Sequence, residues 1–144
     1  LVGSEMCIRD REDADVIVVG VSRTSKTPTC IYLANQGIKA ANYPLVPHIG
    51  ISDELNAIKN TQVVALITSA HALVEIRRKR SATLGINIVD NDYIDIHKVE
   101  EEITAAKRIF ANKGWPVIDI TRRSVEETSS AIMNILSQKE QKNV

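Results

Sequence analysis

A short segment near the start of the chain constrains the fold more than any other feature. Residues 16–19 read Val-Ile-Val-Val, and residues 20–27 read Gly-Val-Ser-Arg-Thr-Ser-Lys-Thr. A buried strand, then Gly-x-x-x-x-Ser-Lys-Thr, then a helical pattern is the layout of a phosphate-binding P-loop, with Ser25 where a glycine is usual. The alternative interpretation is an ordinary strand-to-helix turn rich in Ser and Thr. The order of strand, loop and helix favours the P-loop and predicts that the chain handles a nucleotide.

Each residue type in this motif has a chemical reason to be there. Backbone N–H groups of such a loop, together with the N-terminus of the next helix, form a concave array of donors for phosphate oxygens. Lys26 is expected to place its charge on the terminal phosphates, and the Thr27 hydroxyl is a candidate ligand for Mg²⁺. The candidate nucleotide-binding residues are Gly20, Val21, Ser22, Arg23, Thr24, Ser25, Lys26 and Thr27.

Two positions depart from the usual motif. If position 25 needs a left-handed backbone, the Cβ of Ser25 costs about 1–2 kcal/mol there. Arg23 is also unusual, because small residues normally let such a loop close on its ligand. Its guanidinium suits bidentate contact with a phosphate, and the alternative is a charge that faces solvent.

Composition limits the classes of function. The 144 residues suit one domain, and the formal net charge of +0 gives no electrostatic reason to expect nucleic acid or an anionic membrane as partner. No apolar run approaches the roughly 20 residues of a membrane span. Cys7 and Cys30 stand apart, which is typical of a reducing compartment, and we expect Cys30 to pack as a small hydrophobe. The histidines are dispersed, so a metal held only by protein side chains is not expected.

Hydrophobic periodicity predicts strands that alternate with helices. Strands are expected at residues 16–19, 38–43, 62–68 and 116–120, with a short strand or extended link at 86–89. After the helix that follows the loop and stops at Gly37, further helices are expected at 53–58, 70–83 and 95–113, and a last one opens at the Ser124–Glu127 capping box. This alternation predicts an α/β fold, a P-loop-containing parallel sheet with helices on both faces.

The helical patterns also predict which faces are buried. In helix 70–83 we expect Leu73, Ile76 and Leu84 on one side, with a basic turn at residues 77–80. In helix 95–113 we expect Ile96, Val99, Ile103, Ala106, Ile109 and Phe110 inward and Glu100–Glu102 outward. Residues 14–138 form the expected domain, residues 1–13 an expected non-native or disordered leader, and residues 139–144 an expected frayed tail.

A general base is not identifiable from the pattern. Asp119 ends an apolar strand and is the candidate to orient Mg²⁺, although an Asp at a strand end is more often a turn or capping residue. Asp90, Asp92 and Asp95 have weaker claims. Arg77 and Arg80 lie one helical turn apart and are candidates for contact with a phosphate or substrate, the alternative being a solvated basic face.

Several motifs together resemble one family. They are Gly20-Val-Ser-Arg-Thr-Ser-Lys-Thr-Pro28, Tyr32-Leu-Ala-Asn-x-Gly37-Ile-Lys-x-Ala-Asn42 and Pro44-Leu-Val-Pro47, followed by Ile76-Arg77-x-x-Arg80, Tyr93, Trp115-Pro-Val-Ile118 and Glu126-Glu-Thr128. This set is similar to the bifunctional regulatory proteins of pyruvate, phosphate dikinase and phosphoenolpyruvate synthase. The resemblance runs from Ala14 to Ser137, and its Pro44–Pro47 segment is closer to the dikinase branch.

The resemblance implies a serine/threonine kinase that uses ADP to phosphorylate, and so inactivate, a threonine of the dikinase. The same protein would remove that phosphate with inorganic phosphate and release pyrophosphate. Members of the family are about twice as long, so this chain resembles the C-terminal half. Lys26 and Thr27 are the catalytic candidates, and ADP and Mg²⁺ are the expected cofactors. A cytoplasmic location is expected from the absent targeting signal and the metabolic target.

Other functions remain open at this point. The alternatives are the same activity on phosphoenolpyruvate synthase, an ATP-dependent P-loop kinase of small molecules, and a nucleotide-binding domain without catalysis. Transfer from ADP indicates the regulatory kinase, and transfer from ATP indicates the kinase of small molecules. Binding without transfer indicates the domain without catalysis. The sequence does not decide whether the protein is a homo-oligomer.

Overall fold

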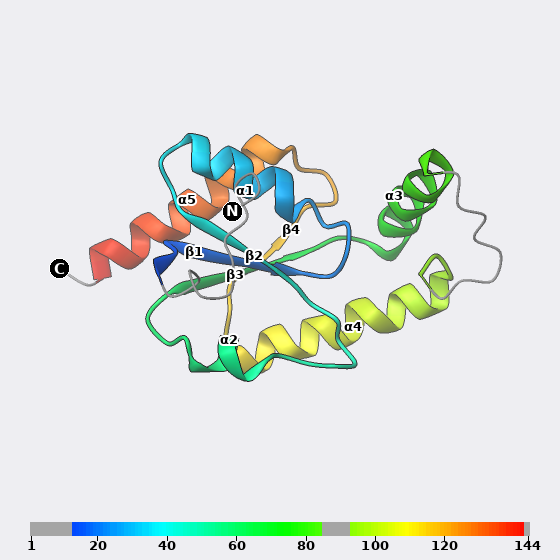
Figure 1. Ribbon diagram of the computed structural model, residues 1–144, viewed down its shortest axis with the longest axis horizontal. Coiled ribbons are helices and arrows are strands. Elements are labelled where there is room, and N and C mark those ends of the chain that lie inside the picture. Colours follow the sequence, from blue (N-terminus) through cyan, green and yellow to red (C-terminus); the bar gives the residue numbers. More distant parts are fainter. Residues whose placement is uncertain (1–12, 85–92, 143–144) are drawn as a thin grey trace.

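A parallel sheet of four strands lies at the centre of the molecule. The computed structural model describes residues 13–84 and 93–142 (Figure 1). The strands are β1 (Val16–Gly20), β2 (Ala40–Pro44), β3 (Gln62–Ile67) and β4 (Val117–Asp119), in the order β2-β1-β3-β4. All three pairings are parallel. Because parallel neighbours end at the same edge of a sheet, the segments that follow these strands gather at one edge.

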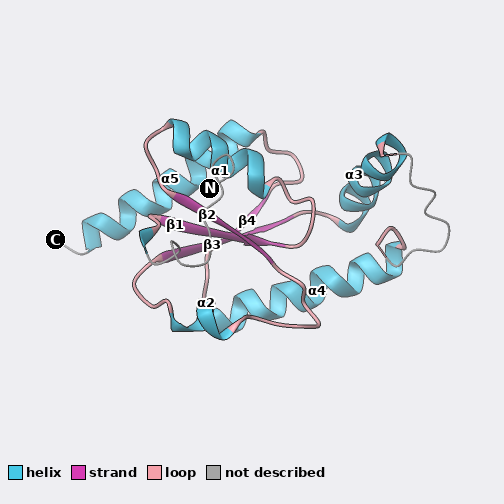
Figure 2. Ribbon diagram, in the orientation of Figure 1, coloured by secondary structure: helices cyan, strands magenta, loops and turns pink. Residues whose placement is uncertain are grey.

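Helices cover both faces of this sheet. They are α1 (Lys26–Asn35), α2 (Asp53–Ala57), α3 (Ala70–Thr83), α4 (Ile96–Lys113) and α5 (Val125–Lys142). Helices α1 and α5 lie on one face, and α2 and α4 lie on the other, as Figure 2 shows. The α/β fold and the parallel sheet expected from the alternating pattern are therefore confirmed.

Strand β1 packs against both helical layers. Ile17 and Val19 belong to the apolar cluster that α3 and α4 complete, whereas Val16 and Val18 belong to the cluster formed with α1 and α5. All five residues of β1 are buried, as expected for a strand covered on both faces. A continuous run of β-branched residues is the sequence signature of such a strand, and the strand expected at residues 16–19 is confirmed.

The path of the chain reverses at β1. The chain runs from β1 to its neighbour β2 and then returns to β3 on the other side of β1. In sheets of this kind, ligands bind outside the carboxyl ends of the strands at the point where the path reverses. The loop between β1 and α1, residues 21–25, lies at that point, and we refer to it as the β1–α1 loop.

The helix ends follow the residues that the sequence provides. Ser52, Ser69 and Asp95 accept hydrogen bonds from the first-turn N–H groups of α2, α3 and α4. Gly114 ends α4 with a left-handed φ of 68°. The Ser124 hydroxyl accepts from the Glu127 N–H and donates to the Glu127 carboxylate, so the expected capping residues do meet at the start of α5.

Two sequence predictions about helix faces are wrong. Ile76 and Leu84 are 42% and 56% exposed, and α3 buries Arg77 instead. The Glu102 side chain points toward α3 rather than outward and pairs with that arginine. Helix α5 extends to Lys142 and the Lys139 ammonium donates to Asn60 O, whereas fraying of residues 139–144 stays a prediction.

Some predictions fall outside the described residues. These are the strand or link at residues 86–89 and nearly all of the leader at residues 1–13. Across residues 13–84 and 93–142, the structure contains no helix that combines the length and apolar character needed to cross a bilayer.

Phe110 provides a test of the α4 side of the core. Its ring is fully buried and lies beside Trp115, with the ring centroids 6.3 Å apart. Phe110→Ala is expected to lower the free energy of unfolding by about 3–5 kcal/mol, because it removes buried apolar surface and leaves a cavity. Urea denaturation measures this, with Ile49→Ala, at a 76% exposed position, as the control expected to stay within about 0.5 kcal/mol of the parent. Equal effects at both positions would contradict this packing.

Candidate functional site

A pocket of about 370 Å³ opens beside the β1–α1 loop. Its lining combines residues 22–28 with Asn42 and Pro44 from strand β2 and Ile76 from helix α3. Among the residues that the structure describes, the charged ones in this lining are Arg23 and Lys26, and none of the lining residues carries a carboxylate. A pocket with this charge at the N-terminus of a helix suits an anionic ligand.

Gly20 is required at the start of the loop by lack of space. A Cβ at this position would lie 2.5 Å from Thr24 Oγ1 and 3.0 Å from Leu66 O. The second atom belongs to the backbone of the neighbouring strand β3, which cannot move independently of the sheet. The first belongs to a buried side chain whose hydroxyl donates to Val21 O at 2.8 Å. Glycine thus lets the loop close tightly against β3.

The loop backbone is strained at two residues. Arg23 and Ser25 have φ angles of 70° and 61°, in the left-handed region that side chains with a Cβ rarely adopt. Each costs about 1–2 kcal/mol relative to a right-handed residue. The condition considered for Ser25 from the sequence, a left-handed backbone, is therefore met, and its hydroxyl makes no capping bond to α1. The Arg23 side chain is exposed.

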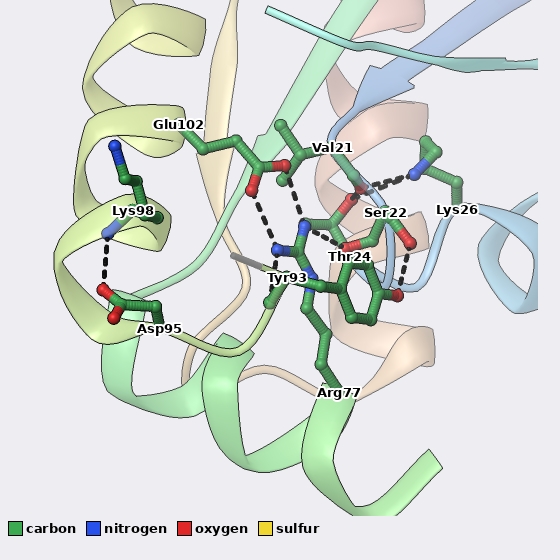
Figure 3. A network of polar contacts seen from close by, with 9 residues as sticks. All are labelled: Val21, Ser22, Thr24, Lys26, Arg77, Tyr93, Asp95, Lys98 and Glu102. Atoms are coloured by element: carbon green, nitrogen blue, oxygen red, sulfur yellow. Dashed lines mark hydrogen bonds and ion pairs between the residues drawn. The ribbon is translucent and has the colours of Figure 1, made fainter. Parts of the chain in front are cut away.

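The Lys26 side chain folds back against the β1–α1 loop rather than extending into solvent. Its side chain is buried, and its ammonium donates to Val21 O at 2.6 Å and to Thr24 Oγ1 at 3.3 Å (Figure 3). The first residue of α1 therefore brings a positive charge to the inside of the turn that precedes it. A charge in this position is available to an anion in the pocket.

Thr27 and Asn42 meet at the mouth of the pocket. The Asn42 amide on β2 donates to Thr27 Oγ1 at 3.0 Å, and Thr27 is exposed. Asn42 belongs to one of the sequence motifs, but the motif by itself indicates no role at the site. The sequence signal for a role at the site is the position of Asn42 near the end of the second strand. Strand β2 pairs with β1 in register, with Val18 opposite Asn42.

Arg77 is the largest fully buried side chain in the described structure, with 1% of its surface exposed. Its two terminal nitrogens donate to the two carboxylate oxygens of Glu102 on α4, both at 2.8 Å. The guanidinium also lies 4.2 Å from the centre of the Tyr93 ring (Figure 3). The interpretation of Arg77 as part of a solvated basic face is therefore wrong.

The same guanidinium reaches the β1–α1 loop. Arg77 Nη2 donates to Ser22 O at 3.2 Å, and Nη1 donates to Tyr93 O at 3.0 Å. The Ser22 and Tyr93 hydroxyls are hydrogen-bonded to each other at 2.8 Å. Arg80, by contrast, is exposed at the surface of α3 and does not join this network. The structure therefore does not bring the two arginines together as a pair.

Asp119 lies at a different place on the sheet edge. It is the last residue of β4, with β3 between it and β1, and it lines a separate pocket with Ser69, Thr121, Arg122, Arg123 and Glu127. Its carboxylate accepts from the Thr121 hydroxyl at 2.5 Å and from the Thr121 N–H at 2.9 Å. These two bonds hold the pKa of Asp119 below its ordinary value, and the bond from the Thr121 hydroxyl has the largest effect. This arrangement is the turn role that we weighed against an Mg²⁺ role.

The other carboxylates considered for the site are either in a capping role or outside the described residues. Asp95 caps α4 by accepting from His97 N and Lys98 N, and Asp90 and Asp92 lie outside the described residues. Among the described residues, no three His, Cys, Asp or Glu side chains gather in a way that would hold a metal ion.

Comparison with known proteins matches most of this chain. A family model described as "Kinase/pyrophosphorylase" matches residues 6–133. The chain is 57% identical over 129 residues to a pyruvate, phosphate dikinase regulatory protein of Caulobacter vibrioides, covering 90% of this chain and 41% of that protein. It is 55% identical over 125 residues to one from Bartonella quintana, covering 87% of this chain and 44% of that protein. A relative from Rhodopseudomonas palustris strain BisB18 is 46% identical over 129 residues, covering 90% of this chain and 46% of that protein. The chain spans less than half the length of these three relatives.

The strain at Ser25 can be measured by two substitutions. Ser25→Gly is expected to raise the free energy of unfolding by about 1 kcal/mol relative to Ser25→Ala, because glycine adopts a left-handed backbone without the Cβ penalty. The alanine variant is the matched control, since it also lacks the hydroxyl but keeps the Cβ. Equal urea midpoints for the two variants would show that position 25 is not strained.

The turn at Asp119 predicts a specific titration. Thr121→Val is expected to raise the pKa of Asp119 toward its ordinary value, because the bond with the largest effect on that carboxylate is lost. A lowered pKa favours the folded state above the ordinary pKa, and this contribution is lost as pH falls through the lowered value. NMR titration of the Asp119 carboxyl carbon checks the shift, with Thr83→Val, whose hydroxyl bonds Lys79 O, as the control. An unchanged Asp119 titration in the Thr121 variant would be the contrary result.

Proposed function

The chain belongs to the kinase/pyrophosphorylase family, and from that membership we propose that it carries the phosphate-handling site of a bifunctional regulator of pyruvate, phosphate dikinase. In one direction ADP phosphorylates a threonine of the dikinase and inactivates it. In the other, inorganic phosphate removes that phosphoryl group. The names of the relatives, each a dikinase regulatory protein, support the choice of target over phosphoenolpyruvate synthase.

Both proposed reactions involve a compound with two linked phosphates. In the kinase direction, the threonine oxygen attacks the β-phosphorus of ADP, the bond to the α-phosphate oxygen breaks, and AMP leaves while the hydroxyl proton passes to a base. In the reverse activity, an oxygen of inorganic phosphate attacks the phosphorus of phosphothreonine. The threonine oxygen then leaves and takes up a proton, and pyrophosphate is released. A linked pair of phosphates is thus present in ADP and in pyrophosphate, which favours a single cradle for both directions.

The observation that carries this proposal is the position of the Lys26 ammonium. It lies on the carbonyl of Val21 inside the β1–α1 loop, and the exposed side chains of Arg23 and Thr27 flank it along the pocket. Such donors suit the non-bridging oxygens of two adjacent phosphates, and a positive charge there stabilises the charge that develops during phosphoryl transfer.

The residues at the pocket mouth fit a Mg²⁺ that arrives with the nucleotide. Thr27 offers a hydroxyl oxygen, the type of ligand that Mg²⁺ prefers, and the Asn42 amide orients that oxygen. Within residues 13–84 and 93–142 the pocket lining has no carboxylate, so most of the ion's ligands would come from phosphates and water. When bound, Mg²⁺ supplies neutralisation of phosphate charge. We place the general base outside this lining, in other parts of the complete protein.

Lys26→Ala tests the loop directly. Isothermal titration of the 144-residue chain is expected to show tighter binding of Mg-ADP than of Mg-ATP, and Lys26→Ala is expected to weaken Mg-ADP binding by about 10- to 100-fold, since it removes a charged donor. Lys79→Ala, an exposed lysine on α3, is the control and is expected to bind like the parent. Tighter binding of Mg-ATP would instead support an ATP-dependent kinase of small molecules.

Catalysis is tested in a longer protein. In a chimera, residues 14–138 replace the matching residues of the Caulobacter vibrioides relative, and phosphate transfer to and from the dikinase is followed with each donor. Lys26→Ala is expected to impair both directions, because both use the same cradle. Loss of one direction with the other spared would rule out a single site. Mg-ADP binding without any transfer would indicate a nucleotide-binding domain without catalysis.

A further inference from the structure

The burial of Arg77 demands an explanation beyond packing. A guanidinium that leaves water needs its charge and its N–H groups satisfied, and Glu102 meets the larger part of this need with two parallel hydrogen bonds. A buried ion pair adds little net stability compared with apolar side chains of similar size. What apolar side chains cannot do is donate a hydrogen bond to a third group, and Arg77 does so at Ser22 O.

Ser22 is held at two atoms from this side of the loop. Arg77 Nη2 donates to its carbonyl, and its hydroxyl is bonded to the Tyr93 hydroxyl. Tyr93 is itself held, because Arg77 Nη1 donates to its carbonyl and the guanidinium lies over its ring. One side chain on α3 therefore fixes both the backbone and the side chain of the second loop residue (Figure 3).

The peptide bond carries this restraint into the pocket. In a trans peptide group the C=O and the following N–H point in opposite directions, and the described chain has no cis peptide bonds. When Arg77 holds Ser22 O, the N–H of Arg23 therefore points away from Arg77. Arg23 lines the pocket and Arg77 does not. Arg23 is also one of the two left-handed residues, and such strain persists only where neighbouring groups enforce it.

We propose that Arg77, itself held by Glu102, is a positioning residue that locks the β1–α1 loop in its strained, phosphate-binding shape by donating to Ser22 O. The identity of the ligand rests on the function proposed above, whereas the effect on loop shape does not. Arg77 thus acts through the loop backbone from behind the pocket, rather than as the surface phosphate clamp considered from the sequence.

Two measurements test the proposal, one of them without ligand. Hydrogen exchange of the 144-residue chain reports the opening of loop amides at residues 21–25, and titration with Mg-ADP reports affinity. Arg77→Lys is expected to speed exchange at Arg23 and Thr24 about tenfold, with β1 amides unchanged, and to weaken Mg-ADP about tenfold, because a lysine cannot reproduce the fork of donors. Arg78→Lys, the same change at the next residue in an exposed pair with Glu75, is expected to alter neither.

A double variant separates positioning from simple stability. Arg77→Met with Glu102→Leu replaces the ion pair by apolar side chains, and its urea midpoint is expected to return close to that of the parent. Its loop exchange is expected to remain about tenfold fast and its Mg-ADP affinity about tenfold weak, since no donor reaches Ser22 O. Parent-like exchange and affinity in this variant would overturn the proposal. If the unaltered chain does not bind Mg-ADP, the proposed ligand fails, but the exchange comparison still decides whether Arg77 positions the loop.

Discussion

Strand β1 is the constraint on which the rest of this structure depends. It pairs with a parallel strand on each side and is buried on both faces. Two neighbouring strands and two helical layers therefore set its direction and register together. A single-residue shift of β1 would exchange Val16 and Val18 with Ile17 and Val19 between the two apolar clusters. The loop that follows β1 is therefore anchored at its first residue with little freedom. From there the backbone must turn within five residues to start α1.

That short turn is possible only with support from several directions. Gly20 allows contact with β3, and Thr24 and Lys26 both donate to Val21 O from within the turn. These contacts cost the donors their interactions with water, but they keep two left-handed residues in place. The protein's own groups therefore hold this loop in shape. A loop held in this way spares a ligand the entropy cost of ordering it.

The parts of the site that could be predicted from sequence are those set by short-range rules. The β-branched run, Gly20 and the Ser25-Lys26-Thr27 sequence lie within a dozen residues, so strand, loop and helix could be placed together. The capping residues Ser124 and Glu127 at the start of α5 could be predicted for the same reason.

The features that the sequence could not place depend on strand order and on pairing between distant helices. The sequence offered Asp119 as a candidate without showing the order of strands, in which β3 lies between β4 and β1. Arg77 was misread because hydrophobic periodicity assumes that the buried face of a helix is its apolar face. Here Ile76 is exposed at the pocket and Arg77 is buried against Glu102, 25 residues away. A single sequence does not show that partnership, since each charge by itself is typical of a surface.

The choice of arginine at this point follows from the number of groups that must be satisfied together. Two carboxylate oxygens and two carbonyl oxygens converge on one side chain: they come from Glu102 on α4, from Tyr93 shortly before α4, and from Ser22 in the β1–α1 loop. A guanidinium has five donors in a fixed planar fork, whereas an ammonium has three on a flexible stem. Arg77 can therefore bind the α4 carboxylate and the loop carbonyl in the same geometry. Because the loop peptide held on one side presents its N–H on the other, the position of α4 and the shape of the pocket are joined through a single peptide group.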